Sequence, residues 1–124
     1  MVRPVLTLEQ RKHEELADAI DAIWTRSRDV IMSRVSLIEA AATSLVASSL
    51  TESDRLEAQR AAHRLAGTVG IFGFHDASSL ARDIELALDS RALDEPLTVL
   101  HIAERARALR DALSVENPTE RCAH

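Results

Sequence analysis

An uninterrupted helical rhythm constrains this chain more than any other feature of its sequence. Apolar or small residues recur in alternating steps of four and three between residues 16 and 45, and no proline or glycine interrupts them. Such steps keep side chains on one face of an α-helix and are typical of a bundle or coiled-coil seam. The seam consists of Leu16, Ile20, Ile23, Ser27, Val30, Arg34, Leu37, Ala41 and Leu45.

The seam predicts one long helix, or a pair of helices, over about residues 8–48, with Thr7 as the N-terminal cap. A helix of roughly 40 residues is about 60 Å long at 1.5 Å per residue. This exceeds the length of the helices that follow, so we expect a kink or an overhanging N-terminal part. The overhang either stays free, folds back, or forms a homodimer with a second copy of the chain.

Three shorter helices are predicted in the rest of the chain, between about residues 52 and 116. Thr51 and the acidic Asp54 mark the start of the first, and Gly73 is a suitable stop. Asp76 is expected to cap the next helix, which ends near residue 90. The last begins with Pro96 in its first turn and ends at residues 117–118, which leaves residues 117–124 as a tail.

Composition agrees with an all-α fold. The chain has 124 residues, no tyrosine, one tryptophan and three prolines, so residues that favour strands and turns are scarce. We predict a single domain, an antiparallel up-down-up-down four-helix bundle. Its last three helices would bury Ala58, Ala62, Leu65, Val69, Phe72, Ala77, Leu80, Ala81, Ile84, Leu88, Val99, Ile102, Ala103, Ala106, Leu109 and Leu113.

Charge and cysteine content exclude several classes of protein. A net charge of −5 without a basic stripe argues against a nucleic-acid partner. The lone Cys122 permits no disulfide framework within the chain. Neither a leader segment nor a long apolar run is visible, so we expect no membrane association and a cytoplasmic location.

All three glycines follow a histidine within one predicted helix. Gly67, Gly70 and Gly73 are spaced by three residues, and His63 precedes them. On a helical wheel His63 lies roughly 140° from the centre of the apolar stripe, and Gly67 and Gly70 lie on the same outward side. Because each glycine inside a helix costs about 1 kcal/mol relative to alanine, we infer that a partner approaches the backbone there.

The predicted outward face around His63 combines polar, basic and apolar residues. Gln59 and Arg60 share this face, Arg64 lies to one side, and Leu56 points outward where a polar residue would be more favourable. An imidazole between two arginines suits an anionic group such as phosphoryl. We predict partner docking at Leu56, Gln59, Gly67 and Gly70.

This stretch resembles the histidine-containing phosphotransfer (HPt) domain, most closely the N-terminal phosphotransfer domain of chemotaxis-type histidine kinases. The family carries His-x-x-Lys-Gly, glycines seven and ten residues after the histidine, and a polar residue 22 positions after it. The matching residues are His63, Gly67, Gly70, Gly73, Glu85 and the aromatic Phe72.

The resemblance implies a phosphorelay intermediate rather than a kinase. His63 would accept a phosphoryl group from a receiver-domain aspartate or a histidine kinase and pass it on. Glu85 would hold one ring nitrogen so that the other is the nucleophile. No cofactor of its own is implied, because the receiver domain supplies Mg²⁺.

One residue departs from the family pattern: Ala66 occupies the position of the lysine thought to hold the phosphoryl group. Arg64, Arg60 and Arg82 are the candidates to replace it, although arginine and lysine are not equivalent at such a site.

Two alternatives remain at this point. The first is a non-catalytic helical adaptor or dimerisation module that retains the HPt shape, which the long first helix and Ala66 favour. The second is a metal-sensing bundle that uses the scattered histidines. No histidine pair has metal-ligand spacing with a supporting carboxylate or cysteine, so we predict no metal site and expect His13, His75 and His101 to be surface residues.

Overall fold

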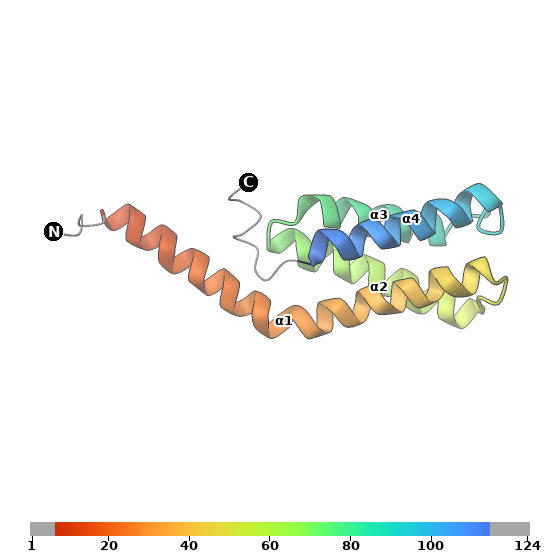
Figure 1. Cartoon of the computed structure of the whole chain (residues 1–124), viewed down its shortest axis with the longest axis horizontal. Helices are drawn as coiled ribbons and strands as arrows, with labels where there is room; N and C mark the ends of the chain where they lie inside the picture. The colour runs from red at the N-terminus through yellow and green to blue at the C-terminus, as the bar shows by residue number, and fades with distance from the viewer. Residues whose placement is uncertain (1–6, 115–124) are drawn as a thin grey trace.

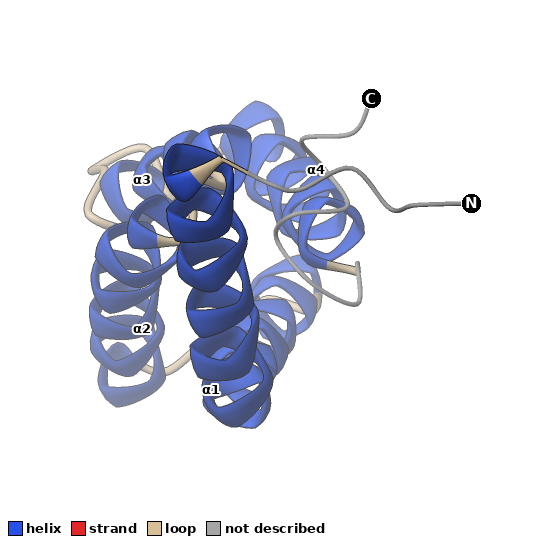
Figure 2. Ribbon diagram, turned by 90° about the vertical axis from the view of Figure 1, so that its left-hand side faces the viewer, coloured by secondary structure: helices blue, strands red, loops and turns tan. Residues whose placement is uncertain are grey.

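Four helices arranged as an antiparallel bundle make up the fold, as expected. A computed structural model describes residues 7–114 of the chain. The helices are α1 (Leu8–Val46), α2 (Glu52–Ile71), α3 (His75–Leu88) and α4 (Pro96–Leu113), and no strand occurs within residues 7–114. Figure 1 shows α2, α3 and α4 side by side with the second half of α1, and Figure 2 shows the four-helix cross-section.

The first helix is single and longer than its partners, as its sequence predicts. It has 39 residues and starts at a capping box, in which Thr7 and Gln10 hydrogen-bond reciprocally. It ends at Val46, and Ser48 then adopts a positive φ of 56° in the turn to α2. The N-terminal half of α1 bends and projects beyond the other three helices (Figure 1).

The face that α1 buries differs from the predicted seam. Leu16, Ile23 and Val30 are 59%, 45% and 53% exposed, so the prediction is wrong at these positions, whereas Ala41 and Leu45 of the same seam are buried. The N-terminal half of the helix carries two apolar stripes, and the bundle covers the other one. The buried residues of α1 are Trp24, Ile31, Val35, Ile38, Ala41, Ala42 and Leu45.

Three aromatic residues join α1 to the turn between α2 and α3. Trp24 and Phe74 are fully buried, and their ring centroids are 4.9 Å apart. Phe72 meets Trp24 edge-on at 5.3 Å, a favourable arrangement of aromatic rings. Trp24 therefore closes the end of the bundle at the point where α2 turns into α3.

The turn between α2 and α3 depends on Gly73. Its φ is +83°, a conformation that side chains with a Cβ rarely adopt, and the predicted stop at this residue is confirmed. The expected cap at Asp76 is wrong. The N-cap is Phe74, whose ring enters the core, so α3 begins one residue before Asp76.

The remaining boundaries follow the sequence with one exception. Thr51 caps α2 by accepting a hydrogen bond from the backbone of Asp54, and Pro96 occupies the first turn of α4. The last helix ends at Leu113, earlier than the predicted stop at residues 117–118. The tail predicted at residues 117–124 lies outside the described residues.

The predicted core of the last three helices is largely confirmed. Most of its members are buried, while Phe72, Leu80, Val99 and Ala103 are half-buried. Ala61 and Ala66 are buried in addition, because α2 contacts both of its neighbouring helices. The buried alanines allow these helices to lie close together around α2.

Candidate functional site

An exposed histidine on α2 forms a hydrogen bond with a carboxylate on α3. His63 Nδ1 lies 2.7 Å from Glu85 Oε1, although the two residues are 22 positions apart in sequence. The side chain of His63 is 73% exposed, whereas that of Glu85 is 24% exposed. The predicted outward orientation of His63 is therefore found in the structure, and the fold brings Glu85 to it.

This geometry determines which ring nitrogen of His63 is free. A carboxylate accepts hydrogen bonds, so Nδ1 carries the ring proton and donates a hydrogen bond to Glu85. In the neutral imidazole Nε2 then holds the lone pair and faces outward, because most of the ring is exposed. The pair presents an oriented nucleophilic nitrogen to anything that docks on this face.

The packing of α3 against α2 supports this pair one turn further along α2. Ser78 Oγ on α3 donates a hydrogen bond of 2.7 Å to the carbonyl of Ala66. A Cβ on Gly70 would lie 3.4 Å from Ser78 Oγ. Gly70 therefore faces α3 and is half-buried, which corrects its predicted outward orientation. Sequence reasoning missed Ser78. The only sequence signal for it is that a small polar residue stands within an apolar helix pattern.

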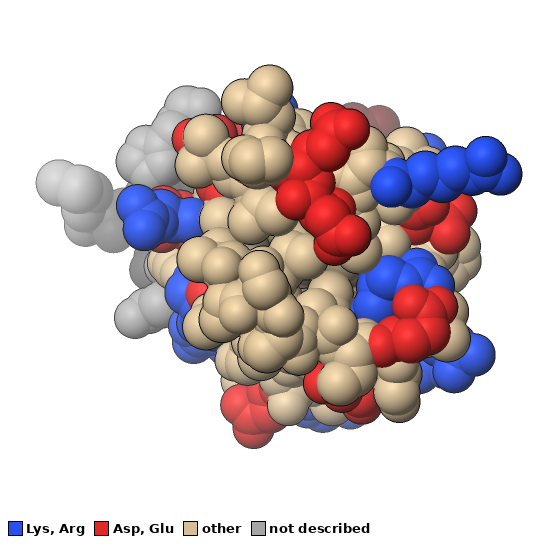
Figure 3. All heavy atoms as spheres, turned by 90° about the vertical axis from the view of Figure 1, so that its right-hand side faces the viewer, with Lys and Arg blue, Asp and Glu red and all other residues tan. Residues whose placement is uncertain are grey.

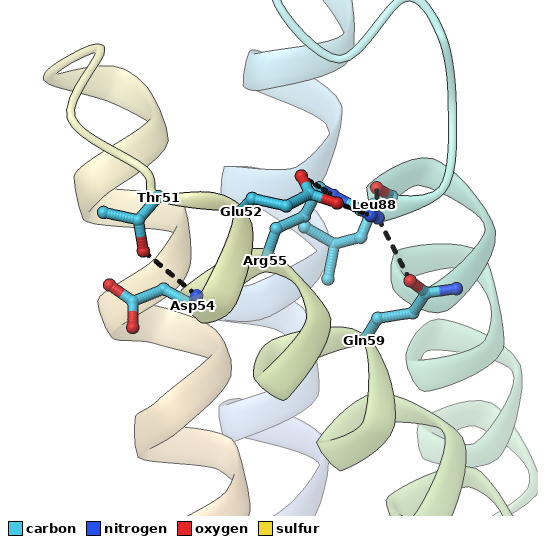
Figure 4. Close-up of polar contacts among 6 residues, drawn as sticks. All are labelled: Thr51, Glu52, Asp54, Arg55, Gln59 and Leu88. Carbon is cyan, nitrogen blue, oxygen red and sulfur yellow. Dashed lines mark hydrogen bonds and ion pairs between the residues drawn. The ribbon is translucent and has the colours of Figure 1, made fainter.

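At the opposite end of α2, Arg55 connects the two helices. Its guanidinium donates hydrogen bonds to the Leu88 carbonyl at 3.0 Å and to Gln59 Oε1 at 3.1 Å (Figure 4). It also donates a hydrogen bond to the carboxylate of Glu52, and this hydrogen bond lowers the pKa of Glu52 from its ordinary value. Gln59, predicted as a docking residue, is thus half-buried and held by Arg55.

Three arginines around the pair are free to meet an anion. Arg60 and Arg64 on α2 and Arg82 on α3 are exposed, and within residues 7–114 no hydrogen-bond or ion-pair partner is found for any of their side chains. By contrast, Ala66 is only 5% exposed. The position at which the resemblance expects lysine therefore lies on the buried side of α2, and the available cations lie elsewhere.

The surface next to His63 is open at Gly67. No atom lies within 4 Å of the place where a Cβ on Gly67 would stand. Along the same side of α2, Leu56 is 38% exposed and Ile71 is 83% exposed. Ile71 was missed by the sequence analysis, which treated the end of this helix only as a turn. The histidine thus lies on an exposed face with apolar residues towards both ends.

A groove with a volume of about 700 Å³ lies away from this face, between the end of α1 and the start of α4. Most of its lining residues are apolar, and Figure 3 views the molecule from this end, where much of the surface is uncharged. Neither His63 nor Glu85 lines this groove or four smaller ones among the described residues. The pair therefore lies on an open face of the bundle rather than in one of these grooves.

Residues 7–114 contain neither a metal-binding cluster nor a helix that could span a membrane. No group of three histidine, cysteine, aspartate or glutamate residues is placed to hold a metal ion. No helix in this part of the chain combines the length and apolar character needed to cross a membrane.

The antiparallel four-helix bundle is consistent with the fold of a phosphotransfer module. A family model of the Hpt domain matches residues 31–116, and the chain belongs to this family. Hpt domains act in phosphorelays through histidine phosphotransfer, interact with histidine kinases and receiver domains, and have no kinase activity of their own.

The comparisons also gave one curated relative. The chain is similar to Protein RcaC of Microchaete diplosiphon, with 28% identity over 94 residues. The match covers 76% of this chain but only 14% of that protein. No solved structure matches the chain.

Proposed function

We propose that this protein is a phosphorelay intermediate in which His63 is the phosphoacceptor. The observation that carries the proposal is the hydrogen bond between His63 Nδ1 and Glu85, combined with the exposure of the ring. The donor or acceptor would be an aspartate of a receiver domain, or a histidine kinase. These partners support the cytoplasmic location expected from the sequence.

The proposed transfer is a displacement at phosphorus. Nε2 of His63 attacks the aspartyl phosphate of the partner, the N–P bond forms, and the P–O bond to the aspartate breaks. The aspartate leaves as a carboxylate, and the positive charge that develops on the imidazole is stabilised by Glu85 through the Nδ1 proton. Transfer in the opposite direction retraces the same step.

The charge of the bound phosphoryl group requires cations from both proteins. A phosphoryl group brings up to about two negative charges. We propose that Arg64, Arg60 and Arg82 contact its oxygens, since all three are exposed and free within the described chain. The receiver domain would supply Mg²⁺, so this protein needs no cofactor of its own.

Transfer from a phosphorylated partner tests the proposal. The protein is incubated with a phosphorylated receiver domain, or with a histidine kinase and ATP, and the product is analysed by peptide mass spectrometry. We expect an acid-labile, base-stable phosphate located on His63. Absence of label from every donor tried, or label on another residue, would favour the alternative of a non-catalytic adaptor.

Removing the carboxylate partner should slow transfer without preventing folding. In the variant Glu85→Ala, the ring loses a charge-assisted hydrogen bond worth about 1.5–3 kcal/mol. The transfer rate should fall by roughly 10-fold to 100-fold, because the imidazole is no longer held in one tautomer. Asp83→Ala is the matched control, since Asp83 lies near Arg105 instead of His63. Equal rates in the two variants would show that Glu85 does not orient the ring.

Substitutions at Gly67 should separate stability from transfer. Because a Cβ meets no atom there, Gly67→Ala should raise the free energy of unfolding by about 0.5–1 kcal/mol. Gly67→Leu should also fold, but its side chain would project next to His63 and lower the transfer rate at least tenfold. Chemical denaturation and the transfer assay measure the two effects, and normal transfer by Gly67→Leu would exclude docking at this position.

A further inference from the structure

The N-terminal half of α1 carries an exposed apolar stripe that the bundle does not use. Leu16, Ile23 and Val30 are spaced by seven residues, and each is about half exposed. The stripe is distinct from the buried face of the same helix, to which Trp24 and Ile31 belong. A seven-residue repeat of large aliphatic residues is the pattern by which one α-helix pairs with another.

The position of this stripe leaves it available to another molecule. This half of α1 projects beyond the other three helices (Figure 1). The Hpt family model begins at residue 31, so the stripe lies before the part of the chain that the family shares. The phosphotransfer bundle therefore gives no structural reason for aliphatic side chains at these positions.

We propose that the stripe pairs with the same stripe of a second copy, with the two helices antiparallel. Extending the steps of four and three backwards from Leu16 adds His13 and Glu9 to the seam. In one antiparallel register every seam residue from Glu9 to Arg34 then faces a seam residue of the second copy. The facing pairs are Ile20 with Ile23, Leu16 with Ser27, His13 with Val30, and Glu9 with Arg34.

Charge at the two ends of the seam selects this arrangement. The antiparallel register places Glu9 of each copy opposite Arg34 of the other, and both residues lie within the described helix. A parallel pair in register would place Glu9 against Glu9 and Arg34 against Arg34, which is unfavourable for like charges. Sliding the antiparallel pair by seven residues separates the opposite charges. The side chain of Arg34 is half-buried, and its one hydrogen bond, to Thr68, is long at 3.5 Å.

The expected dimer is elongated and weak. Residues 9–34 overlap over about 39 Å at 1.5 Å per residue, and the two bundles lie at opposite ends of the helix pair. Only four aliphatic residues per copy enter the seam: Leu16, Ile20, Ile23 and Val30. Because so few aliphatic residues are buried, we expect a dissociation constant on the order of micromolar.

Sedimentation equilibrium of the whole chain across the micromolar range tests the pairing. The protein should change from monomer to dimer as its concentration rises, and Ile23→Glu should shift the midpoint at least tenfold towards higher concentration. Leu97→Glu is the matched control, because Leu97 is 79% exposed on α4. A monomer at all concentrations, or a dimer that tolerates Ile23→Glu but not Leu97→Glu, would overturn the proposal.

A charge exchange tests the orientation of the helices. Glu9→Arg and Arg34→Glu should each weaken the dimer several-fold, and the double variant should restore it. Glu15→Arg, with the same change in charge away from the seam, should have little effect. In a parallel pair the double variant would only exchange the two like-charged contacts, so restoration relative to both single variants would not occur. Failure of the double variant to restore the dimer would overturn the antiparallel arrangement. Circular dichroism verifies the fold of each variant.

Discussion

The variant His63→Gln should accept no phosphoryl group from any donor that labels the wild-type protein. Glutamine has no nucleophilic ring nitrogen, whereas its amide can still donate a hydrogen bond to Glu85. Because the side chain of His63 is 73% exposed, the free energy of unfolding should change by no more than about 0.5 kcal/mol. Transfer of labelled phosphate and chemical denaturation measure the two quantities.

The other histidines of the described chain provide the controls for this variant. His75→Gln and His101→Gln remove imidazoles from the start of α3 and from α4, and neither residue has a carboxylate partner among the ion pairs found in residues 7–114. Both variants should be labelled at the wild-type rate. If His63→Gln is labelled as well as they are, His63 is not the phosphoacceptor.

The variant Trp24→Ala should lose about 3–5 kcal/mol of stability, the usual cost of replacing a buried large aromatic residue with alanine. Trp24 is fully buried against Phe72 and Phe74, and its removal leaves a cavity at the end of the bundle. The loss should appear as a lower midpoint in urea denaturation followed by circular dichroism, because the variant has no tryptophan to report fluorescence.

This prediction also concerns the extent of the folded domain, because Trp24 precedes the residues that the family model matches. Leu97→Ala is the control, since Leu97 is 79% exposed and should change stability by less than about 0.5 kcal/mol. A loss below about 1 kcal/mol for Trp24→Ala would mean that the bundle does not need this part of α1.

Much of the fold could be predicted because it depends on local patterns. Thr7, Thr51 and Gly73 lie at the helix ends where their side chains or backbone satisfy unpaired peptide groups. The face that α1 buries could not be predicted in the same way. The helix has two apolar stripes, and the choice between them depends on where α2 and α4 pack, which no local pattern specifies.

The candidate site likewise combines features that a local pattern predicts with features that depend on helix packing. The exposure of His63 and the open space at Gly67 follow from the helical wheel of α2 alone. The orientation of Gly70 towards Ser78 does not, because it depends on how closely α3 approaches. Glu85 was proposed through the family resemblance, and only the packing of α3 on α2 places its oxygen 2.7 Å from the ring.

The sequence by itself determined that this chain forms four helices, where most of them begin and end, and which histidine faces outward. These properties follow from residue spacing and from capping chemistry, both of which act within a few residues. The tertiary structure decided which stripe of α1 is buried, that Ala66 lies on the inner side of α2, and that Glu85 meets His63. These features depend on contacts between helices that are distant in sequence, where packing selects among faces that the local pattern leaves equivalent.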